Sequence, residues 1–213
     1  ALFLSTRDLQ IGRGEEIRDT AKVASRYVSA VMIRAYRHAT IEEFARHATI
    51  PVINGLSDRE HPCQLLADIM TLREHFGSLR DLRVAWIGDG NNVCNSLILS
   101  AVLTGMTVTV STPEGYGPDP AIVRQAVDRG ARIRFAGSPG EAVTAADAVV
   151  TDTWVSMGDE EEREERLAAF RGYTVDENLL ARASEHVRVL HCLPAHRGEE
   201  ISSGIIDGPA SLV

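Results

Sequence analysis

From residue 82 onward, short apolar runs alternate with longer segments of helical periodicity. We expect strands at residues 82–87, 107–110, 132–135, 148–150 and 187–190, and helices at residues 92–103, 119–129, 141–145 and 160–170. In such a chain each helix crosses over the sheet and returns the next strand parallel to the last. The alternation therefore predicts an α/β fold with a doubly wound parallel sheet and helices on both faces.

The first part of the chain has a smaller version of the same alternation. Helices are expected at residues 15–27 and 40–47, and strands at residues 30–33 and 50–53. Thr40 and Glu43 have the spacing of a capping box at the start of the second helix. These elements make up a first lobe.

A further helix is expected to join the two lobes. It begins at Pro62, because proline suits the first turn of a helix, and ends near Gly77. Its apolar stripe consists of Leu65, Leu66, Ile69, Met70 and Leu72. We therefore divide the chain into a first domain, residues 1–76, which ends in this linker helix, and a second domain, residues 77–213.

Composition narrows the class of partner. The chain has 213 residues, 44% of them hydrophobic, which suffices for one good core or two modest ones. A formal net charge of −8 without any lysine- or arginine-rich run argues against nucleic acid and anionic membrane as partners. No apolar run is long enough to span a bilayer. Cys63, Cys94 and Cys192 include no close-spaced pair, which favours a reducing cytoplasm and predicts no metal site.

Polar residues follow the predicted strands, at the end where parallel sheets bind their ligands. Asn91 and Asn92 follow the first strand of the second lobe, where they either meet a zwitterionic ligand or cap the next helix. The segment Gly88-Asp89-Gly90 in the same turn invites comparison with dinucleotide-binding loops. Val93 stands where the third glycine of such a loop falls, so a tight turn is the favoured interpretation.

Asp152 and Cys192 follow later strands. The Asp152 carboxylate suits an α-ammonium, while the Ser156 hydroxyl and the Met157 backbone amide suit an α-carboxylate. Taken alone, the segment that contains Asp152 also suits a helix cap. Cys192 follows an apolar strand, where a cysteine is usually packed in the core. We do not interpret it as a covalent nucleophile, because His191 precedes it on a strand and successive strand residues point to opposite faces.

The segment His61-Pro62-Cys63-Gln64 places an imidazole and an amide at the mouth of the linker helix. Both side chains, aided by the positive end of the helix, can donate to a carbonyl oxygen that gains negative charge. An N-terminal capping arrangement with an exposed His61 is an equally good interpretation. Arg34 ends a strand, where it is either a surface residue or an anion ligand with a permanent charge.

Three segments together resemble the signature of the carbamoyltransferases, and most closely the ornithine carbamoyltransferases. They are His61-Pro62-Cys63-Gln64, Thr151-Asp152-Thr153-Trp154-Val155-Ser156-Met157-Gly158 and His191-Cys192-Leu193-Pro194, and the likeness runs through nearly all 213 residues. The resemblance implies transfer of the carbamoyl group of carbamoyl phosphate to the δ-amine of L-ornithine, in arginine metabolism, without a cofactor. It also implies a homotrimer, a carbamoyl-phosphate-binding first domain and an ornithine-binding second domain.

The resemblance further implies roles for single residues. Those that hold carbamoyl phosphate are Gln10, Arg34, His61, Pro62, Cys63, Gln64, Cys192 and Leu193, of which Gln10 reaches a neighbouring subunit's site. Those that bind ornithine are Asn92, Asp152, Ser156 and Met157. The catalytic group is Arg34, His61, Gln64 and Cys192, the first three as donors to the oxyanion of the tetrahedral intermediate.

One departure from the family pattern lies near the start of the chain. The family's phosphate clamp reads Ser-Thr-Arg-Thr at a helix N-terminus, whereas Ser5-Thr6-Arg7 is followed here by Asp8. We therefore expect a chain truncated at both ends and inactive by itself. The competing predictions are a sister enzyme acting on putrescine, N-acetylornithine or aspartate, and a non-catalytic amino-acid-binding module. The ornithine prediction depends mainly on Ser156-Met157-Gly158.

Overall fold

The computed structural model describes residues 1–5, 9–155 and 160–213. The chain divides into two compact units, Ala1–Cys63 and Gln64–Val213. This boundary precedes the one at residues 76 and 77 that the sequence suggests. The reason is that α3 (Pro62–Phe76) packs with the second unit, because Leu65 and Leu72 belong to that unit's apolar core.

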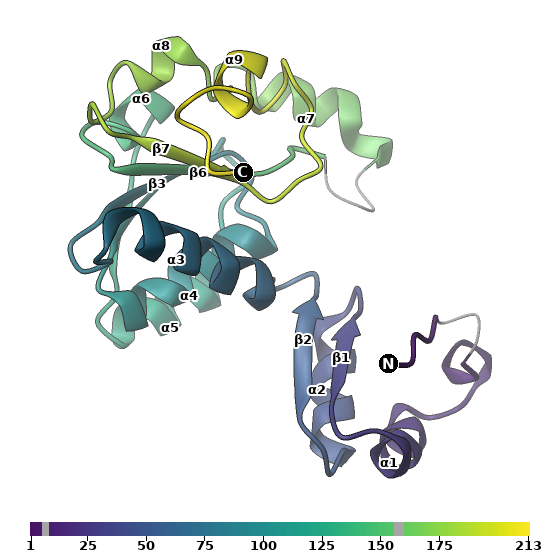
Figure 1. Ribbon diagram of the computed structural model, residues 1–213. Coiled ribbons are helices and arrows are strands. Elements are labelled where there is room, and N and C mark those ends of the chain that lie inside the picture. Colours follow the sequence, from purple (N-terminus) through teal and green to yellow (C-terminus); the bar gives the residue numbers. More distant parts are fainter. Residues whose placement is uncertain (6–8, 156–159) are drawn as a thin grey trace. The chain divides into compact units, whose positions relative to one another are not determined.

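The first unit consists of short elements around a small core. Its elements are η1 (Ile11–Arg13), α1 (Ile17–Tyr27), β1 (Val31–Arg34), α2 (His38–His47) and β2 (Val52–Leu56). The two strands pair in parallel, with Val31 opposite Val52, and α1 and α2 contact each other (Figure 1). Ala21, Ile41 and Phe44 are the buried apolar residues of these helices.

The capping box expected at Thr40 and Glu43 is wrong, because α2 begins earlier, at His38. The backbone N–H of His38 donates to the carboxylate of Asp58 at 2.9 Å. A side chain from a later loop thus satisfies a backbone donor of the first turn, which is the task that a local cap would otherwise perform. Thr40 therefore lies inside the helix.

The second unit contains the parallel sheet that the alternation predicts. Its strands are β3 (Arg83–Ile87), β4 (Thr107–Ser111), β5 (Arg132–Phe135), β6 (Ala148–Thr151) and β7 (Arg188–His191). Its helices after α3 are α4 (Asn92–Thr104), α5 (Pro120–Asp128), α6 (Pro139–Ala142), η2 (Glu160–Glu162), α7 (Arg163–Ala169), α8 (Glu177–Leu180) and α9 (Ser203–Ile206). The strand order is β5-β4-β3-β6-β7, and every neighbouring pair is parallel.

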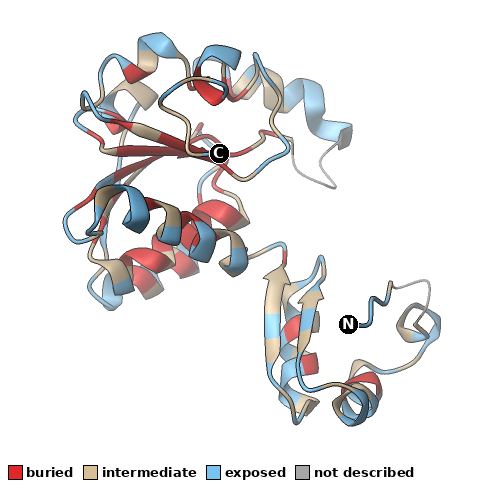
Figure 2. Ribbon diagram, in the orientation of Figure 1, coloured by how far each residue is buried: buried red, intermediate tan, exposed pale blue. Residues whose placement is uncertain are grey.

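Both faces of this sheet are covered by helices, as the doubly wound fold requires. In β3, Val84 and Trp86 point into an apolar cluster with α3, α4 and α5. Ala85 and Ile87 point into a second cluster with α6, α8 and α9. Figure 2 shows the buried residues concentrated on the strands and on α4. The period of two along β3 thus places one apolar layer on each side of the sheet.

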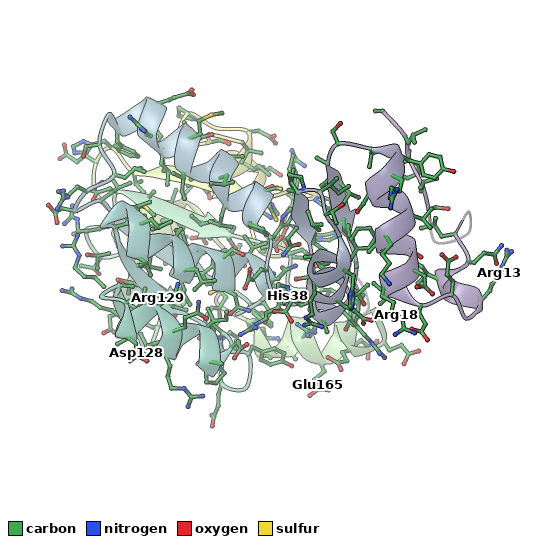
Figure 3. All side chains as sticks on the ribbon, turned by 90° about the horizontal axis from the view of Figure 1, so that it is seen from below. Arg13, Arg18, His38, Asp128, Arg129 and Glu165 are labelled. Atoms are coloured by element: carbon green, nitrogen blue, oxygen red, sulfur yellow. The ribbon has the colours of Figure 1, made fainter. Side chains whose placement is uncertain are left out.

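The acidic helix α7 has a solvated face, as its sequence indicates. Glu165, labelled in Figure 3, is exposed on it. Among the described residues, none of the helices combines the length and the apolar character needed to cross a membrane.

The strand order sets the position of the site. The chain leaves β3 for β4 on one side and later returns to β6 on the other side, so β3 and β6 flank the topological switch point. In open α/β sheets, ligands bind beyond the carboxyl ends of the strands at such a point. The residues that follow Ile87 and Thr151 therefore lie at the expected binding crevice.

Candidate functional site

The carboxylate of Asp152 is the centre of the site in the second unit. It follows β6 directly and is buried. Its Oδ2 accepts from Nδ2 of Asn91 at 2.7 Å, and its Oδ1 accepts from Sγ of Cys192 at 2.8 Å. The backbone N–H of Thr153 also donates to Oδ1, at 2.7 Å. Residues that follow β3, β6 and β7 thus converge on one carboxylate.

Asn91 combines two tasks that the sequence left as alternatives for Asn91 and Asn92. Its Oδ1 accepts from the backbone N–H groups of Val93 and Cys94, at 3.0 and 3.2 Å, which caps α4. Its Nδ2 meanwhile donates to Asp152. One side chain therefore fixes both the start of the helix and the orientation of the carboxylate. Asn92 is the first residue of α4, and its contact with ornithine stays a prediction.

The thiol of Cys192 is a neutral hydrogen-bond donor. Burial raises its pKa far above the usual range, and the negative charge of Asp152 raises it further. A protonated thiol donates to a carboxylate but is a poor nucleophile, because the thiolate is the reactive form. The environment of Cys192 therefore favours a hydrogen-bonding role, and its part in the reaction stays a prediction.

The expectation that His191 and Cys192 diverge is wrong. Nitrogen, sulfur and oxygen atoms of His191, Cys192 and Asp152 all lie within 4.8 Å of one another. The reason is that β7 ends at His191, so the alternation of side chains stops there.

Both ring nitrogens of His191 nevertheless interact with groups other than Asp152 and Cys192. Its Nδ1 accepts from the backbone N–H of Leu193 at 2.9 Å, so the proton resides on Nε2, which lies 3.2 Å from Oε1 of Glu200. Both side chains of the His191–Glu200 pair are fully buried. This pair holds the backbone of Leu193, which is half exposed at a φ of 54° and precedes the cis-proline Pro194.

Within the part of the chain that the structure describes, two groups of side chains have the spacing of metal ligands. The first is Asp152, His191 and Cys192, and the second is His196, Glu199 and Glu200. In the first group both ring nitrogens of His191 are engaged and the thiol is protonated, so Asp152 alone offers an anionic ligand. In the second group Glu199 pairs with Arg163, and the backbone N–H of His196 donates to Glu200. The other carboxylate oxygen of Glu200, Oε2, is buried and lies 3.7 Å from Nδ1 of His196.

Asp68 is a site residue that the sequence interpretation missed. It lies on α3, is 6% exposed, and accepts from Nε2 of Gln64 at 2.9 Å. Burial raises the pKa of its carboxyl to about 6; the hydrogen bond from Gln64 acts against this, and the charge of Asp152 adds to it. The sequence does contain a signal that could have identified Asp68: its spacing from Leu65 and Leu72 places it on the same face of the helix as these apolar residues. An aspartate on a buried helix face needs an explanation, because burying a charge is costly.

The buried stripe of α3 also differs from the predicted one. Leu65 and Leu72 are buried, whereas Leu66 and Met70 are 66% and 59% exposed. A five-residue apolar pattern on a helix covers more than one face, and here only the face that contains Asp68 meets the core of the second unit.

Arg166 is a second residue with an unforeseen role. The predicted pair with Glu162 forms, at 3.3 Å. The same guanidinium also donates to Asp89 at 3.0 Å and to the backbone oxygen of Trp154 at 3.1 Å, and it lies over the ring of Tyr116. It thereby ties α7 to the loops after β3 and β6.

The segment Gly88-Asp89-Gly90 is a tight turn, the interpretation favoured over a nucleotide loop. Gly88 has a φ of 131°, a conformation that side chains with a Cβ rarely adopt. A Cβ on Gly90 would lie 2.2 Å from the backbone nitrogen of Pro118. The local fold therefore requires both glycines without reference to a pyrophosphate.

The predicted carbamoyl-phosphate residues of the first unit lie at the ends of its elements. Arg34 is the exposed last residue of β1, and Gln10 is the exposed residue before η1. His61 is half-buried just before α3, whose first residue is Pro62, as predicted. Cys63 is exposed, and its thiol donates to the backbone oxygen of Asn54 at 3.4 Å. Ser156 and Met157 lie outside the described residues.

A thiol reagent at neutral pH is expected to label Cys63 before the other cysteines, because its side chain is exposed. Burial raises the pKa of the Cys94 thiol well above its usual value, and the pKa of Cys192 is raised in the same way. Both thiols are therefore protonated and slow to react. Peptide mass spectrometry after limited treatment measures the order of labelling, with a Cys63→Ser variant as control. Labelling of Cys192 first would contradict the neutral thiol.

Comparison with known proteins identifies the family to which both units belong. The family model of the aspartate/ornithine carbamoyltransferase carbamoyl-P binding domain matches residues 1–74, and the model of the Asp/Orn binding domain matches residues 80–213. Ornithine carbamoyltransferases of Methanoculleus marisnigri and Archaeoglobus fulgidus are 62% and 56% identical over 213 residues. Each alignment covers 100% of this chain and 69% of the relative.

Solved structures that resemble this chain belong to the same family. The ornithine carbamoyltransferase from Pyrococcus furiosus matches with a TM-score of 0.94 at 47% identity, over 100% of this chain and 69% of that one. The enzyme from Thermus thermophilus matches with a TM-score of 0.88 at 45% identity, over 99% of this chain and 69% of that one. The resemblance found in the sequence is confirmed, and the chain belongs to the aspartate/ornithine carbamoyltransferase family.

Proposed function

We propose that the full-length protein catalyses carbamoyl transfer to ornithine with the residues of this chain that converge on Asp152 and those that flank Pro62. The reaction joins the δ-amine of L-ornithine to the carbonyl carbon of carbamoyl phosphate and gives L-citrulline and phosphate. The observation that carries the proposal is the buried carboxylate of Asp152, held by Asn91 and Cys192 at the switch point of the sheet. Family membership of both units supports it.

In the proposed mechanism the substrates supply the chemistry and the protein supplies position and charge. The amine, as the free base, attacks the carbonyl carbon, and Arg34 and His61 donate to the oxygen that becomes negative. Gln64, which the sequence resemblance also makes a donor to the oxyanion, has its Nε2 engaged by Asp68 at 2.9 Å, so in this scheme it holds the carbamoyl group instead. Nucleophile, electrophile and leaving group all belong to the substrates, so this scheme has no step for a cofactor or a metal ion.

Recognition of ornithine is proposed to depend on its α-carbon groups. Asp152 pairs with the α-ammonium, Asn92 lies beside it, and Ser156 and Met157 receive the α-carboxylate. Cys192, as a neutral thiol, lines the junction between the substrates together with Leu193. A neutral neighbour does not stabilise a positive charge on the δ-nitrogen, so it favours the reactive free amine.

The setting of the enzyme is also a proposal. We infer a homotrimer in which Gln10 reaches the site of a neighbouring subunit, a cytoplasmic location and a place in arginine biosynthesis. Light scattering coupled to gel filtration tests the first of these inferences, with a trimer or a multiple of trimers as the expected mass. A purely monomeric active protein would contradict it.

Citrulline formation is expected with ornithine and not with putrescine, aspartate or N-acetylornithine. Putrescine lacks the α-carboxylate, N-acetylornithine lacks the α-ammonium, and aspartate would place a second carboxylate in an acidic site. A site built to hydrogen-bond a substrate group rejects analogues without it by a factor of about 10⁴ or more. The measurement is kcat/KM for each amine with the full-length protein and carbamoyl phosphate. Comparable turnover of putrescine would overturn the substrate assignment.

Calorimetry separates the enzyme from a non-catalytic amino-acid sensor. An enzyme of this mechanism should bind ornithine strongly only after carbamoyl phosphate, whose carbamoyl group completes the site. A sensor should bind ornithine alone. The discriminating result is the dependence of the ornithine binding heat on the presence of carbamoyl phosphate.

A further inference from the structure

One buried carboxyl group at the edge of the site has no part in the mechanism above. Asp68 lies one helical turn after Gln64 on α3, and it is 6% exposed. Its Oδ1 accepts the hydrogen bond from Nε2 of Gln64 at 2.9 Å. Burying a carboxyl group costs free energy, so this buried aspartate calls for an explanation.

The hydrogen bond determines which end of the Gln64 amide faces the site. A carboxylate accepts hydrogen bonds and donates none, so it selects the amide nitrogen. With Nε2 held against Asp68, the amide oxygen Oε1 is left to act as the acceptor. The amino group of a carbamoyl substrate is a donor and needs such an acceptor.

We propose that Asp68 is a positioning residue for carbamoyl transfer, because its carboxylate holds the Gln64 amide in the one orientation that presents an acceptor to the carbamoyl amino group. This inference rests on the proposed function, in which Gln64 holds the carbamoyl group. Asp68 itself touches neither substrate in this scheme and acts through Gln64.

The groups around Asp68 make this orientation depend on pH. Gln64 on its own helix, Asp152 after β6 and Cys192 after β7 interact with its carboxyl. Burial raises its pKa to about 6, so the carboxylate form that selects Nε2 is lost as the pH falls through that value. A protonated carboxyl can donate to Oε1 instead, which reverses the amide.

The test is a double-mutant cycle in the full-length protein with Asp68→Asn, Gln64→Ala and the combination. Asparagine has the shape of aspartate but offers both a donor and an acceptor, so it does not select one orientation of Gln64. We expect Asp68→Asn to lower kcat/KM for carbamoyl phosphate by about 10- to 100-fold, the range for a lost hydrogen bond to a charged group. In the Gln64→Ala background the same change should have an effect of less than about 2-fold.

Two further readouts separate positioning from a structural role. In the unaltered protein, kcat/KM for carbamoyl phosphate should fall as the pH drops through about 6, and this dependence should disappear in Asp68→Asn. The melting temperature of the variant should not fall, because the variant buries no charge. Asp207→Asn, which removes an exposed carboxylate paired with Arg197, is the matched control and should keep normal kinetics.

The outcomes distinguish this inference from the proposed function. Absence of citrulline formation by the unaltered protein would overturn the proposed function and the inference with it. An active protein whose Asp68→Asn variant keeps normal kcat/KM would overturn the inference alone. Losses that simply add in the double variant would show that Asp68 does not act through Gln64, and a lower melting temperature with normal kinetics would assign it a structural role.

Discussion

The His61→Ala variant of the full-length protein is expected to show a kcat about 100- to 1000-fold lower, with little change in melting temperature. That range is typical for the loss of one donor to an oxyanion. The ring lies just before Pro62, the first residue of α3, where the helix presents its positive end. Steady-state kinetics and thermal unfolding are measured on the same preparations.

His75→Ala is the matched control, because His75 is an exposed residue near the other end of the same helix. It should leave kcat unchanged. A large fall in melting temperature for His61→Ala, with residual folded protein of normal activity, would instead support the capping interpretation of His61.

The Asp152→Asn variant is expected to use ornithine at least about 100-fold less efficiently, measured as kcat/KM at saturating carbamoyl phosphate. Removing one member of a buried, hydrogen-bonded charge pair costs about 2–5 kcal/mol, and the proposed partner here is the α-ammonium of the substrate. The amide also offers Nδ2 where Asn91 now donates, so two donors would oppose each other.

Asp147→Asn tests whether this effect is local. Asp147 lies just before β6, at the opposite end of the strand that Asp152 follows, and it receives hydrogen bonds from Arg83 at 2.8–3.1 Å. Its replacement should change stability modestly and leave ornithine kinetics intact. Normal ornithine use by Asp152→Asn would place the amino-acid site elsewhere.

Local patterns predicted most of the second unit correctly. The spacing of apolar residues that distinguishes a strand from a helix can be recognised within a short stretch of sequence. This spacing correctly located the five strands of the sheet and the helices from α3 to α5. Asp119 starts α5 as predicted, since its side chain accepts from the backbone N–H of Ala121. Four residues are too few to define a helical period, so the single-turn helix α6 was expected slightly too late, at residues 141–145, and α8 and α9 were not predicted.

Long-range contacts account for the local patterns that failed. The start of α2 depends on Asp58, which lies 20 residues after His38 and so outside any capping-box window. The direction of the His191 side chain depends on where β7 ends and on Glu200. Arg166 has a local partner in Glu162, yet its buried contact is with Asp89, far away in the chain.

The amino-acid order alone placed Asp152 and Cys192 at the ends of strands, because the residue that follows an apolar run is visible in a short window. The amino-acid order did not predict the strand order β5-β4-β3-β6-β7, because that order arises from pairing between distant segments. The environment of Asp68 has the same origin. Its raised pKa comes from burial in the folded unit and from a carboxylate that is 84 positions away in the chain, at Asp152, and such proximity exists only once the sheet and α3 have packed together.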